Sequence, residues 1–454
     1  MHIPARSRGS ALAKAESSFV AQRILLPAQH YLHTEITSGI LLVAAAVAAL
    51  IWANSSVGNS YGRFWDTHFA LQFGIFSISH TLREWINDGL MAIFFFVVGL
   101  EIKREFVHGE LVGWKRSALP ILCALGGMIV PAALYLAFNG GKDGAHGWGI
   151  PMATDIAFSL GVLSLVGSRI PSSARIFLLA LATVDDLGAI MVIALFYTDH
   201  LAIVPLLWGV IIAALIVVMR RLGVRTAASY IPFGVLFWFA VLESGVHSTV
   251  AGVILGILTP TEAIREKKTY SEMATGLVKG IKDAVAAKDT DSAEALLGRM
   301  EQLTTETEAP ADRLVRMLHP WSAYMILPLF ALANAGVTFN LSMLKTAFAH
   351  PITLGIVAGL FVGKCLGITG FAFAAVRLGI ANRVPGVSWA QIAGIAMLGG
   401  IGFTISLFIS DLAFREQAMV EMSKIGVFGA SVAAGVAGYL LLRFSKPAVA
   451  QAEH

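Results

Sequence analysis

The chain has 454 residues, of which 56% are apolar and only 14% are charged, with a net charge of +4 and a mean hydropathy of +0.73. A soluble domain carries roughly 25% charged residues, and its helices need polar faces that residues 40–52 lack, so the composition excludes a soluble protein and predicts a polytopic membrane protein. Both cysteines, Cys123 and Cys365, lie inside apolar runs, which excludes a disulfide framework and a CxxC metal cluster; we also expect no nucleic-acid partner.

The first 36 residues are polar and basic. They contain Arg6, Arg8, Lys14 and Arg23 and no apolar core of the length that a cleavable signal peptide needs. Residues 1–36 are therefore predicted to form a cytoplasmic tail.

Apolar stretches of roughly 17 to 25 residues mark transmembrane helices. The predicted spans are residues 37–54, 85–106, 117–138, 148–166, 174–197, 201–219, 226–242, 246–260, 321–337, 351–376, 390–411 and 421–442. The sequence thus predicts an all-α polytopic membrane protein of about twelve transmembrane helices. The first eight helices fall in residues 37–260 and the last four in residues 319–443.

Basic residues predict the orientation of these spans, because loops rich in Lys and Arg resist translocation. The two tails and the even-numbered connections hold 26 of the 33 Lys and Arg residues. Both termini, including the C-terminal tail at 444–454, are therefore predicted to be cytoplasmic.

The segment at 261–318 differs from the rest of the chain. It carries nine basic and eleven acidic residues with few aromatic ones, which predicts a charged cytoplasmic linker. Apolar residues at helical spacing within 270–302 favour one or two surface helices there.

Four ionisable side chains fall near the middle of predicted spans. Asp155 lies in the fourth span, Asp185 and Asp186 in the fifth, and Lys364 in the tenth. Each ionised group at the bilayer centre costs about 2.5 to 3.5 kcal/mol unless it is paired or solvated. One such residue alone could simply pin helices together, but four together indicate a functional site.

The adjacent carboxylates of Asp185 and Asp186 restrict the chemistry of that site. Neighbouring helical residues project about 100° apart, so the two cannot share one simple interface, and two like charges so close cannot both stay ionised without a cation. Hard cations take oxygen ligands, which Asp155 and the Thr154 hydroxyl can supply as well. A site that holds either Na+ or protons predicts antiport, with Asp185 and Asp186 as the Na+ ligands.

Lys364 needs an acidic partner, because a lone buried ammonium is costly. We expect one of the carboxylates, Asp185 first, to pair with it. The pair is either purely structural or breaks as the cation or proton exchanges.

Two spans look interrupted. The fourth contains Pro151 just before Asp155, and the eleventh contains the run Gly399, Gly400, Ile401, Gly402, Phe403 and Thr404. Such breaks in corresponding spans indicate paired discontinuous helices, whose opposed ends need charge compensation; Asp155 would neutralise the N-terminal ends and Lys364 the C-terminal ends. The alternative for the glycines is close helix packing.

Glu101 and Glu105 lie one turn apart on one helix face, and His247 begins the eighth span. These groups could respond to pH, the histidine because its ordinary pKa is near neutrality. The alternative is interfacial ion pairing with Lys103 or Arg104 and a merely polar histidine.

Seven strings of the sequence together resemble the NhaA family of bacterial Na+/H+ antiporters. They are GLEIKRE (99–105), ATDIAF (153–158), DDLGAI (185–190), SGVHSTVAGV (244–253), HPWSAYMILPLFALANAG (319–336), GKCLGI (363–368) and GGIGFT (399–404). The resemblance runs in order from about Ser38 to Arg443, although the linker at 261–318 is longer than we expect in the family.

The resemblance implies a fold of inverted repeats with discontinuous helices in spans 4 and 11. It implies that Asp185 and Asp186 carry Na+ and protons, that Asp155 and Lys364 compensate charge, and that Thr154 lies beside the site. It further implies an electrogenic carrier of the inner membrane with Li+ as an alternative substrate, no cofactor, contact with lipid and, in some cases, homodimers. A pH-responsive cytoplasmic region would contain Glu101, Glu105 and His247.

Two other classes fit parts of the sequence. A symporter or channel could use the same cation site, but a channel needs several rings of ionisable residues, and one midplane cluster is present. An intramembrane aspartyl protease needs two aspartates that share a proton; Asp155 and Asp185 meet that count, yet Lys364 would hold one of them ionised. The sequence therefore predicts a carrier and no enzyme.

Overall fold

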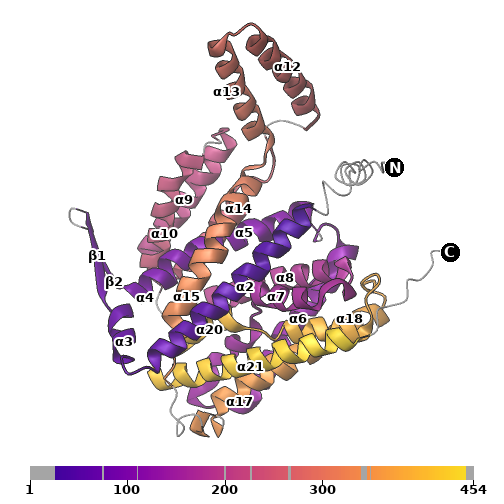
Figure 1. Ribbon diagram of the computed structural model, residues 1–454. Coiled ribbons are helices and arrows are strands. Elements are labelled where there is room, and N and C mark those ends of the chain that lie inside the picture. The colour runs from indigo at the N-terminus through magenta and orange to yellow at the C-terminus, as the bar shows by residue number, and fades with distance from the viewer. Residues whose placement is uncertain are drawn as a thin grey trace, which may run out of the picture.

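The computed structural model describes residues 26–73, 76–109, 111–198, 201–224, 227–263, 267–338, 345–347 and 349–445. Most helices pack side by side in one bundle, from which a helical hairpin and a β-hairpin project (Figure 1). Most of the predicted N-terminal and C-terminal tails lies outside the described residues.

The first half of the chain is helical apart from one hairpin. Its elements are α2 (Leu26–Ala53), α3 (Asn59–Trp65), β1 (His68–Phe73), β2 (Phe76–Thr81), α4 (Leu82–Glu84), η2 (Trp85–Leu90), α5 (Met91–His108), α6 (Trp114–Asn139), η3 (Asp143–Met152), α7 (Ile156–Val166), η4 (Gly167–Arg169) and α8 (Ser172–Phe196). The strands β1 and β2 pair antiparallel, with Phe73 opposite Phe76.

The second half contains further helices and π-helical turns. They are α9 (Ile203–Arg221), α10 (Ala227–Glu243), α11 (Ser248–Leu258), α12 (Lys267–Ala286), α13 (Thr290–Thr307), α14 (Pro310–Trp321), η5 (Ser322–Ile326), α15 (Leu327–Asn334), α17 (Pro351–Val357), η6 (Ala358–Gly363), α18 (Lys364–Arg377), α19 (Trp389–Leu398), α20 (Phe403–Ala413) and α21 (Gln417–Phe444).

The predicted all-α membrane fold is confirmed. Among the described residues, six helices are long and apolar enough to cross a bilayer, and two pairs bent by 46°, η3 with α7 and α19 with α20, each pass as one interrupted span. These pairs are the predicted breaks in spans 4 and 11. Three shorter apolar helices coincide with predicted spans 1, 7 and 8, and the helical run from α14 to α15 covers the residues predicted for span 9.

The helix that leads into the predicted ninth span begins inside the charged segment. That span was expected from residue 321, after the linker, but α14 starts at Pro310. Ala311 and Val315 on its apolar face pack against Leu100 of α5. This contact explains why the helix extends into the charged segment: one face is buried against the bundle while the other stays polar. In the same way, α2 begins at Leu26, inside the predicted tail.

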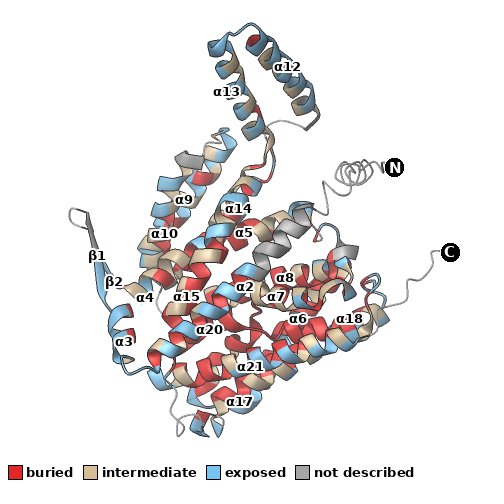
Figure 2. Ribbon diagram, in the orientation of Figure 1, coloured by how far each residue is buried: buried red, intermediate tan, exposed pale blue. Residues whose placement is uncertain are grey.

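The rest of the linker forms the projecting hairpin of α12 and α13, the two surface helices that the periodicity favoured. Asp289 caps α13 by accepting a hydrogen bond from the Ser292 amide at 3.1 Å. Ala284 and Leu303 are buried, but most of the hairpin is exposed (Figure 2). It therefore stands apart from the core that contains the midplane carboxylates.

Glycines bring α5 and α11 into close contact. A Cβ atom on Gly252 would lie 2.1 Å from the Ala92 carbonyl oxygen, and one on Gly256 would lie 2.7 Å from the Leu100 amide nitrogen. Only glycine permits this approach of two backbones. The seam fixes the two helices in parallel, side by side, along the wall of the bundle.

Candidate functional site

The two interrupted spans cross at the centre of the bundle. Residues 153–155 separate η3 from α7, and residues 399–402 separate α19 from α20. The Asp155 amide donates to the Ile401 carbonyl at 2.6 Å, so the two breaks face each other. A Cβ atom on Gly400 would lie 2.2 Å from the Leu360 carbonyl oxygen, which explains a glycine at this crowded position.

Asp155 lies at the N-terminal ends of both half-helices that follow the breaks, α7 and α20. One carboxylate oxygen accepts from the Phe158 amide at 3.0 Å and caps α7. The other accepts from the Thr404 amide at 3.1 Å and the Thr404 hydroxyl at 2.6 Å, at the start of α20. A negative charge here faces the positive ends of two helix dipoles. Asp155 therefore makes the contacts with the starts of α7 and α20 that its predicted role in charge compensation requires.

Two serines complete the crossing in a reciprocal way. The Ser159 hydroxyl in α7 donates to the Leu398 carbonyl at the end of α19 at 2.8 Å, and the Ser406 hydroxyl in α20 donates to the Ile150 carbonyl in η3 at 2.8 Å. The Leu398 carbonyl also accepts from the Ile401 amide at 3.0 Å, whereas the Ser406 hydroxyl supplies a donor to the Ile150 carbonyl near the end of η3, where the helical ladder stops. Sequence reasoning missed both serines, since only their polarity inside an apolar helix marks them.

Lys364 forms an ion pair with Asp185, the partner expected first. Its ammonium also donates to the Thr154 hydroxyl oxygen at 3.1 Å, and the side chains of both charged partners are almost completely buried. Lys364 directly follows η6, a π-helical turn of a kind that often marks functional sites. Among the described residues, the Lys364 ammonium has the Asp185 carboxylate and the Thr154 hydroxyl as its hydrogen-bond partners, and its predicted role in charge compensation stays a prediction.

Thr154 links the ion pair to the break in the eleventh span. Its hydroxyl oxygen lies 2.6 Å from Asp185 Oδ2 and 2.7 Å from the Gly399 carbonyl oxygen. The hydroxyl has a single proton, so it donates to only one of these acceptors at a time. The carboxylate and the end of α19 therefore compete for one donor.

Asp186 is buried next to this network. Among the described residues, Asp185 Oδ1 and Asp186 Oδ1 are buried without a hydrogen-bond partner. The groups that act electrostatically on Asp186 are the carboxylates of Asp185, Asp155 and Glu101, and the Lys364 ammonium. Acidic groups thus outnumber the one cation, and two carboxylate oxygens are left for a proton or a hard metal ion. The described residues contain no cluster of three or more His, Cys, Asp or Glu side chains arranged for a metal. The oxygen atoms near the free carboxylate positions are therefore of two kinds, the carboxylates of Asp185 and Asp186 and the Thr154 hydroxyl.

The pH-response candidates lie at the two ends of the α5 and α11 seam, and their predicted role stays a prediction. Lys103, between Glu101 and Glu105, donates to the Thr259 carbonyl just beyond the end of α11. His247 lies at the opposite end of α11, as its N-cap. Since α11 has 11 residues, the two places are about 16 Å apart. The parallel α5 and α11 seam is the physical reason for this separation.

His247 belongs to the other side of the bundle. Its ring centroid is 5.8 Å from that of Phe408 in α20. It also acts electrostatically on Asp88, which accepts a hydrogen bond from the Ser248 hydroxyl at 2.8 Å. His247 therefore lies beside Phe408 of α20 and near the Asp88 carboxylate, at the end of the α5 and α11 seam away from Glu105.

The fold and the site together define a multi-pass membrane protein of the secondary-transporter class, in which discontinuous helices meet around buried ionisable groups. The family described as Na+/H+ antiporter 1 matches residues 29–442. The chain belongs to this family, which is a family of transporters.

Curated relatives agree over nearly their whole length. The Na+/H+ antiporter NhaA of Oleidesulfovibrio alaskensis is 46% identical over 431 residues, covering 93% of this chain and 94% of the relative. That of Wolinella succinogenes is 43% identical over 429 residues, covering 92% and 94%. That of a Janthinobacterium species is 40% identical over 453 residues, covering 98% and 100%.

Proposed function

We propose that the chain exchanges Na+, or Li+ in its place, for protons across the bacterial inner membrane, and that Asp185 and Asp186 carry the ions. The observation that carries the proposal is the pair of buried, unpartnered carboxylate oxygens beside the Lys364–Asp185 ion pair. Relatives at 40–46% identity are named Na+/H+ antiporters. No cofactor is needed for such an exchange.

Competition for one site converts this arrangement into antiport. A hard cation is bound by the free oxygens of Asp185 and Asp186, with the Thr154 hydroxyl as a further oxygen. Protons that arrive at the same carboxylates remove the negative charge that holds the cation. Because the site accepts cation or protons but not both, release of one requires uptake of the other.

Lys364 and Thr154 adjust during this cycle. When Asp185 takes a proton or a cation, its attraction for the ammonium weakens, and Lys364 keeps the Thr154 hydroxyl as a partner. The hydroxyl proton is then free to satisfy the Gly399 carbonyl. A change of charge at the site is thereby passed to the end of α19. We propose that the exchange is electrogenic and driven by the inward proton gradient.

Access to the site changes when the interrupted spans move. Asp155 holds the starts of α7 and α20 with one carboxylate, so these half-helices shift together. We place both termini in the cytoplasm, together with residues 261–318. One hydrogen bond supports a common side for the ends of α7 and α21, since Arg169 after α7 donates to the Arg443 carbonyl at 3.0 Å.

The proposal extends to regulation and assembly. Glu101 and Glu105 at one end of the α5 and α11 seam and His247 at the other are proposed to tune the pH profile from two separate places. Homodimers in the bilayer are proposed from the family resemblance alone. Cross-linking of the full chain in native membranes would test for them.

The test of exchange uses everted vesicles or proteoliposomes with a preset acid-inside pH gradient. Addition of Na+ or Li+ should dissipate the gradient in the wild type and not in Asp186→Asn. The control is Asp143→Asn, an exposed carboxylate at the start of η3, which should behave as the wild type does. Folded wild-type protein that shows no cation response at any pH from about 6 to 9 contradicts the proposal.

A further inference from the structure

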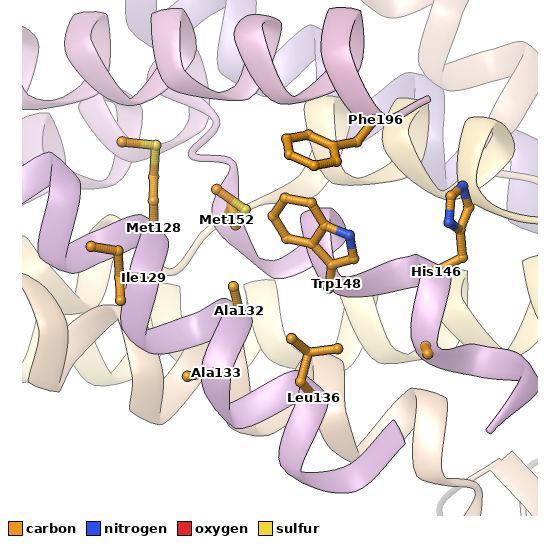
Figure 3. Close-up of a pocket in the computed structure, with 10 residues that line it drawn as sticks. Met128, Ile129, Ala132, Ala133, Leu136, His146, Trp148, Met152 and Phe196 are labelled. Carbon is orange, nitrogen blue, oxygen red and sulfur yellow. The ribbon is translucent and has the colours of Figure 1, made fainter. Parts of the chain in front are cut away.

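A pocket of about 740 Å³ opens on the side of the bundle, between α6, η3 and α8 (Figure 3). Its lining residues are Met128, Ile129, Ala132, Ala133, Leu136, Ala145, His146, Trp148, Met152 and Phe196. The volume is within the range of about 300–1,000 Å³ of small-molecule sites. It is built by the outer half of an interrupted span together with the helix that carries Asp185.

The residues that line the pocket favour an apolar ligand. No Asp, Glu, Lys or Arg side chain is among the lining residues, and its polar side-chain atoms belong to His146 and Trp148. The indole of Trp148 meets Phe196 edge to face, with ring centroids 5.1 Å apart. An open pocket with so apolar a lining is more favourably filled by hydrocarbon than by water.

The mouth of the pocket opens toward the bilayer. Ile129 on α6 is 56% exposed and Phe196 on α8 is 53% exposed, and Leu195 and Met191 beside it are exposed too. These helices are membrane spans, so exposure here means contact with lipid tails. The medium at the mouth is therefore hydrocarbon.

The outer end of the pocket lies at the membrane surface. His146 and Trp148 belong to η3, which starts at Asp143 just after the exposed Lys142. Amphipathic rings such as that of Trp148 prefer the level of the lipid head groups. A lipid whose head group stays at this level can extend its chain inward along α6.

The inner end of the pocket touches the carboxylate helix. A Cβ atom on Gly188 would lie 2.1 Å from Met128 Sδ, so the methionine packs directly on the backbone of α8. Gly188 is one helical turn beyond Asp185. Met152, on the opposite wall, lies two residues before Thr154. An occupant of the pocket therefore packs against two elements that position the site.

We propose that this pocket is a lateral lipid site, in which a single acyl chain of a bilayer phospholipid inserts between α6, η3 and α8. The acyl chain packs against η3, the outer half of the fourth span, where no protein side chain fills the pocket. The size and unsaturation of the chain then set how easily η3 moves against α8.

Trp148 is a natural probe of this site. Purified full-length protein in detergent micelles is titrated with phospholipid that carries brominated acyl chains, and the Trp148 signal is taken as wild type minus Trp148→Phe. We expect saturable quenching at low lipid fraction. Trp208, an exposed residue of α9, gives the reference for ordinary surface contact when the difference with Trp208→Phe is taken.

A pocket-filling variant makes the test specific. Ala132→Phe should weaken saturable quenching of Trp148 by at least about tenfold, and Ala133→Phe serves as a second filling variant in case the first does not fold. The control Ala214→Phe, at an exposed position of α9, should leave it unchanged. Quenching of Trp148 that never saturates and rises in parallel with that of Trp208 would show surface contact only and overturn the site.

Transport adds a readout that rests on the proposed function. In proteoliposomes of defined phospholipids, the wild-type exchange rate should vary with chain length at least about threefold, and Ala132→Phe should flatten this dependence while Ala214→Phe keeps it. If the exchange rate of Ala132→Phe varies with acyl-chain length as strongly as that of the wild type, the proposed effect of the lipid on the movement of η3 is contradicted. If the wild type shows no exchange at all, the proposed function fails while the quenching result still decides the site.

Discussion

Replacement of Lys364 by methionine is the sharpest test of the buried ion pair. Methionine keeps most of the side-chain volume and removes the charge, and the Lys364 side chain is fully buried while that of Asp185 is 2% exposed. At such burial, removal of one partner leaves the other charge without compensation and costs about 3 to 5 kcal/mol. We therefore expect a clear loss of stability in Lys364→Met, together with loss of exchange.

The double variant Lys364→Met with Asp185→Asn separates charge from packing. It leaves a neutral polar group in place of the orphaned carboxylate, so most of the lost stability should return, with a coupling free energy of at least about 2 kcal/mol. Exchange should stay absent, because the carboxylate is missing. Lys142→Met, at an exposed lysine, is the control and should change stability by less than about 0.5 kcal/mol.

Thermal unfolding can be followed through Cys123, which is completely buried. A fluorogenic maleimide labels it only when the bundle opens, and a Cys365→Ala background removes the other cysteine. An unchanged unfolding temperature in Lys364→Met would refute the reasoning, since it would mean that Lys364 and Asp185 do not stabilise each other as charges. An equally low temperature in the double variant would assign the loss to packing.

Three further predictions follow from other contacts. Lys424 is 4% exposed and lies 2.8 Å from Asp411, so Asp411→Asn should cost about 3 kcal/mol of stability by leaving a buried ammonium without its partner. The double variant Asp411→Lys with Lys424→Asp should recover part of the thermal stability if the contact is electrostatic. Gly252→Ala should destabilise the α5 and α11 seam by about 2 kcal/mol or more because the Cβ meets a backbone oxygen, whereas Gly161→Ala, with open space around it, should be neutral or slightly stabilising in the same assay. Burial raises the pKa of Tyr61 from 10.0 to about 12. The stability that the neutral Tyr61 side chain contributes is therefore complete below pH 10 and is lost as pH rises through 12. This loss should vanish in Tyr61→Phe, and an absorbance titration of that variant should lack the phenolate signal of Tyr61.

The spans and the two breaks could be predicted because they depend on local composition. Long apolar stretches reveal transmembrane helices, and Pro151 and the glycine run at 399–402 interrupt them in a way that needs no knowledge of neighbours. The pairing of Lys364 with Asp185 was also accessible, since buried opposite charges have few alternatives. Charge and hydropathy along the chain carried this information.

The crossing could not be predicted in the same way, because its contacts join residues far apart in the sequence. Ser159 and Ser406 look like ordinary helical serines until the carbonyls of the opposite span are placed beside them. The position of His247 depends on the direction in which α11 packs on α5, and the early start of α14 depends on the face that it buries against Leu100. Such features follow from tertiary packing.

The contact between Asp155 and Thr404 has a consequence for biosynthesis. The two residues are separated by 249 positions, and synthesis at roughly 5–20 residues per second takes on the order of ten to fifty seconds to add them. During that time the fourth span is already made, yet the start of α20 does not exist. The nascent fourth span, with its proline and its carboxylate, must wait at the translocon or the membrane surface for a partner from the last sixth of the chain. Ribosome stalling after residue 400 should therefore leave Asp155 accessible to water, and release of the complete chain should bury it.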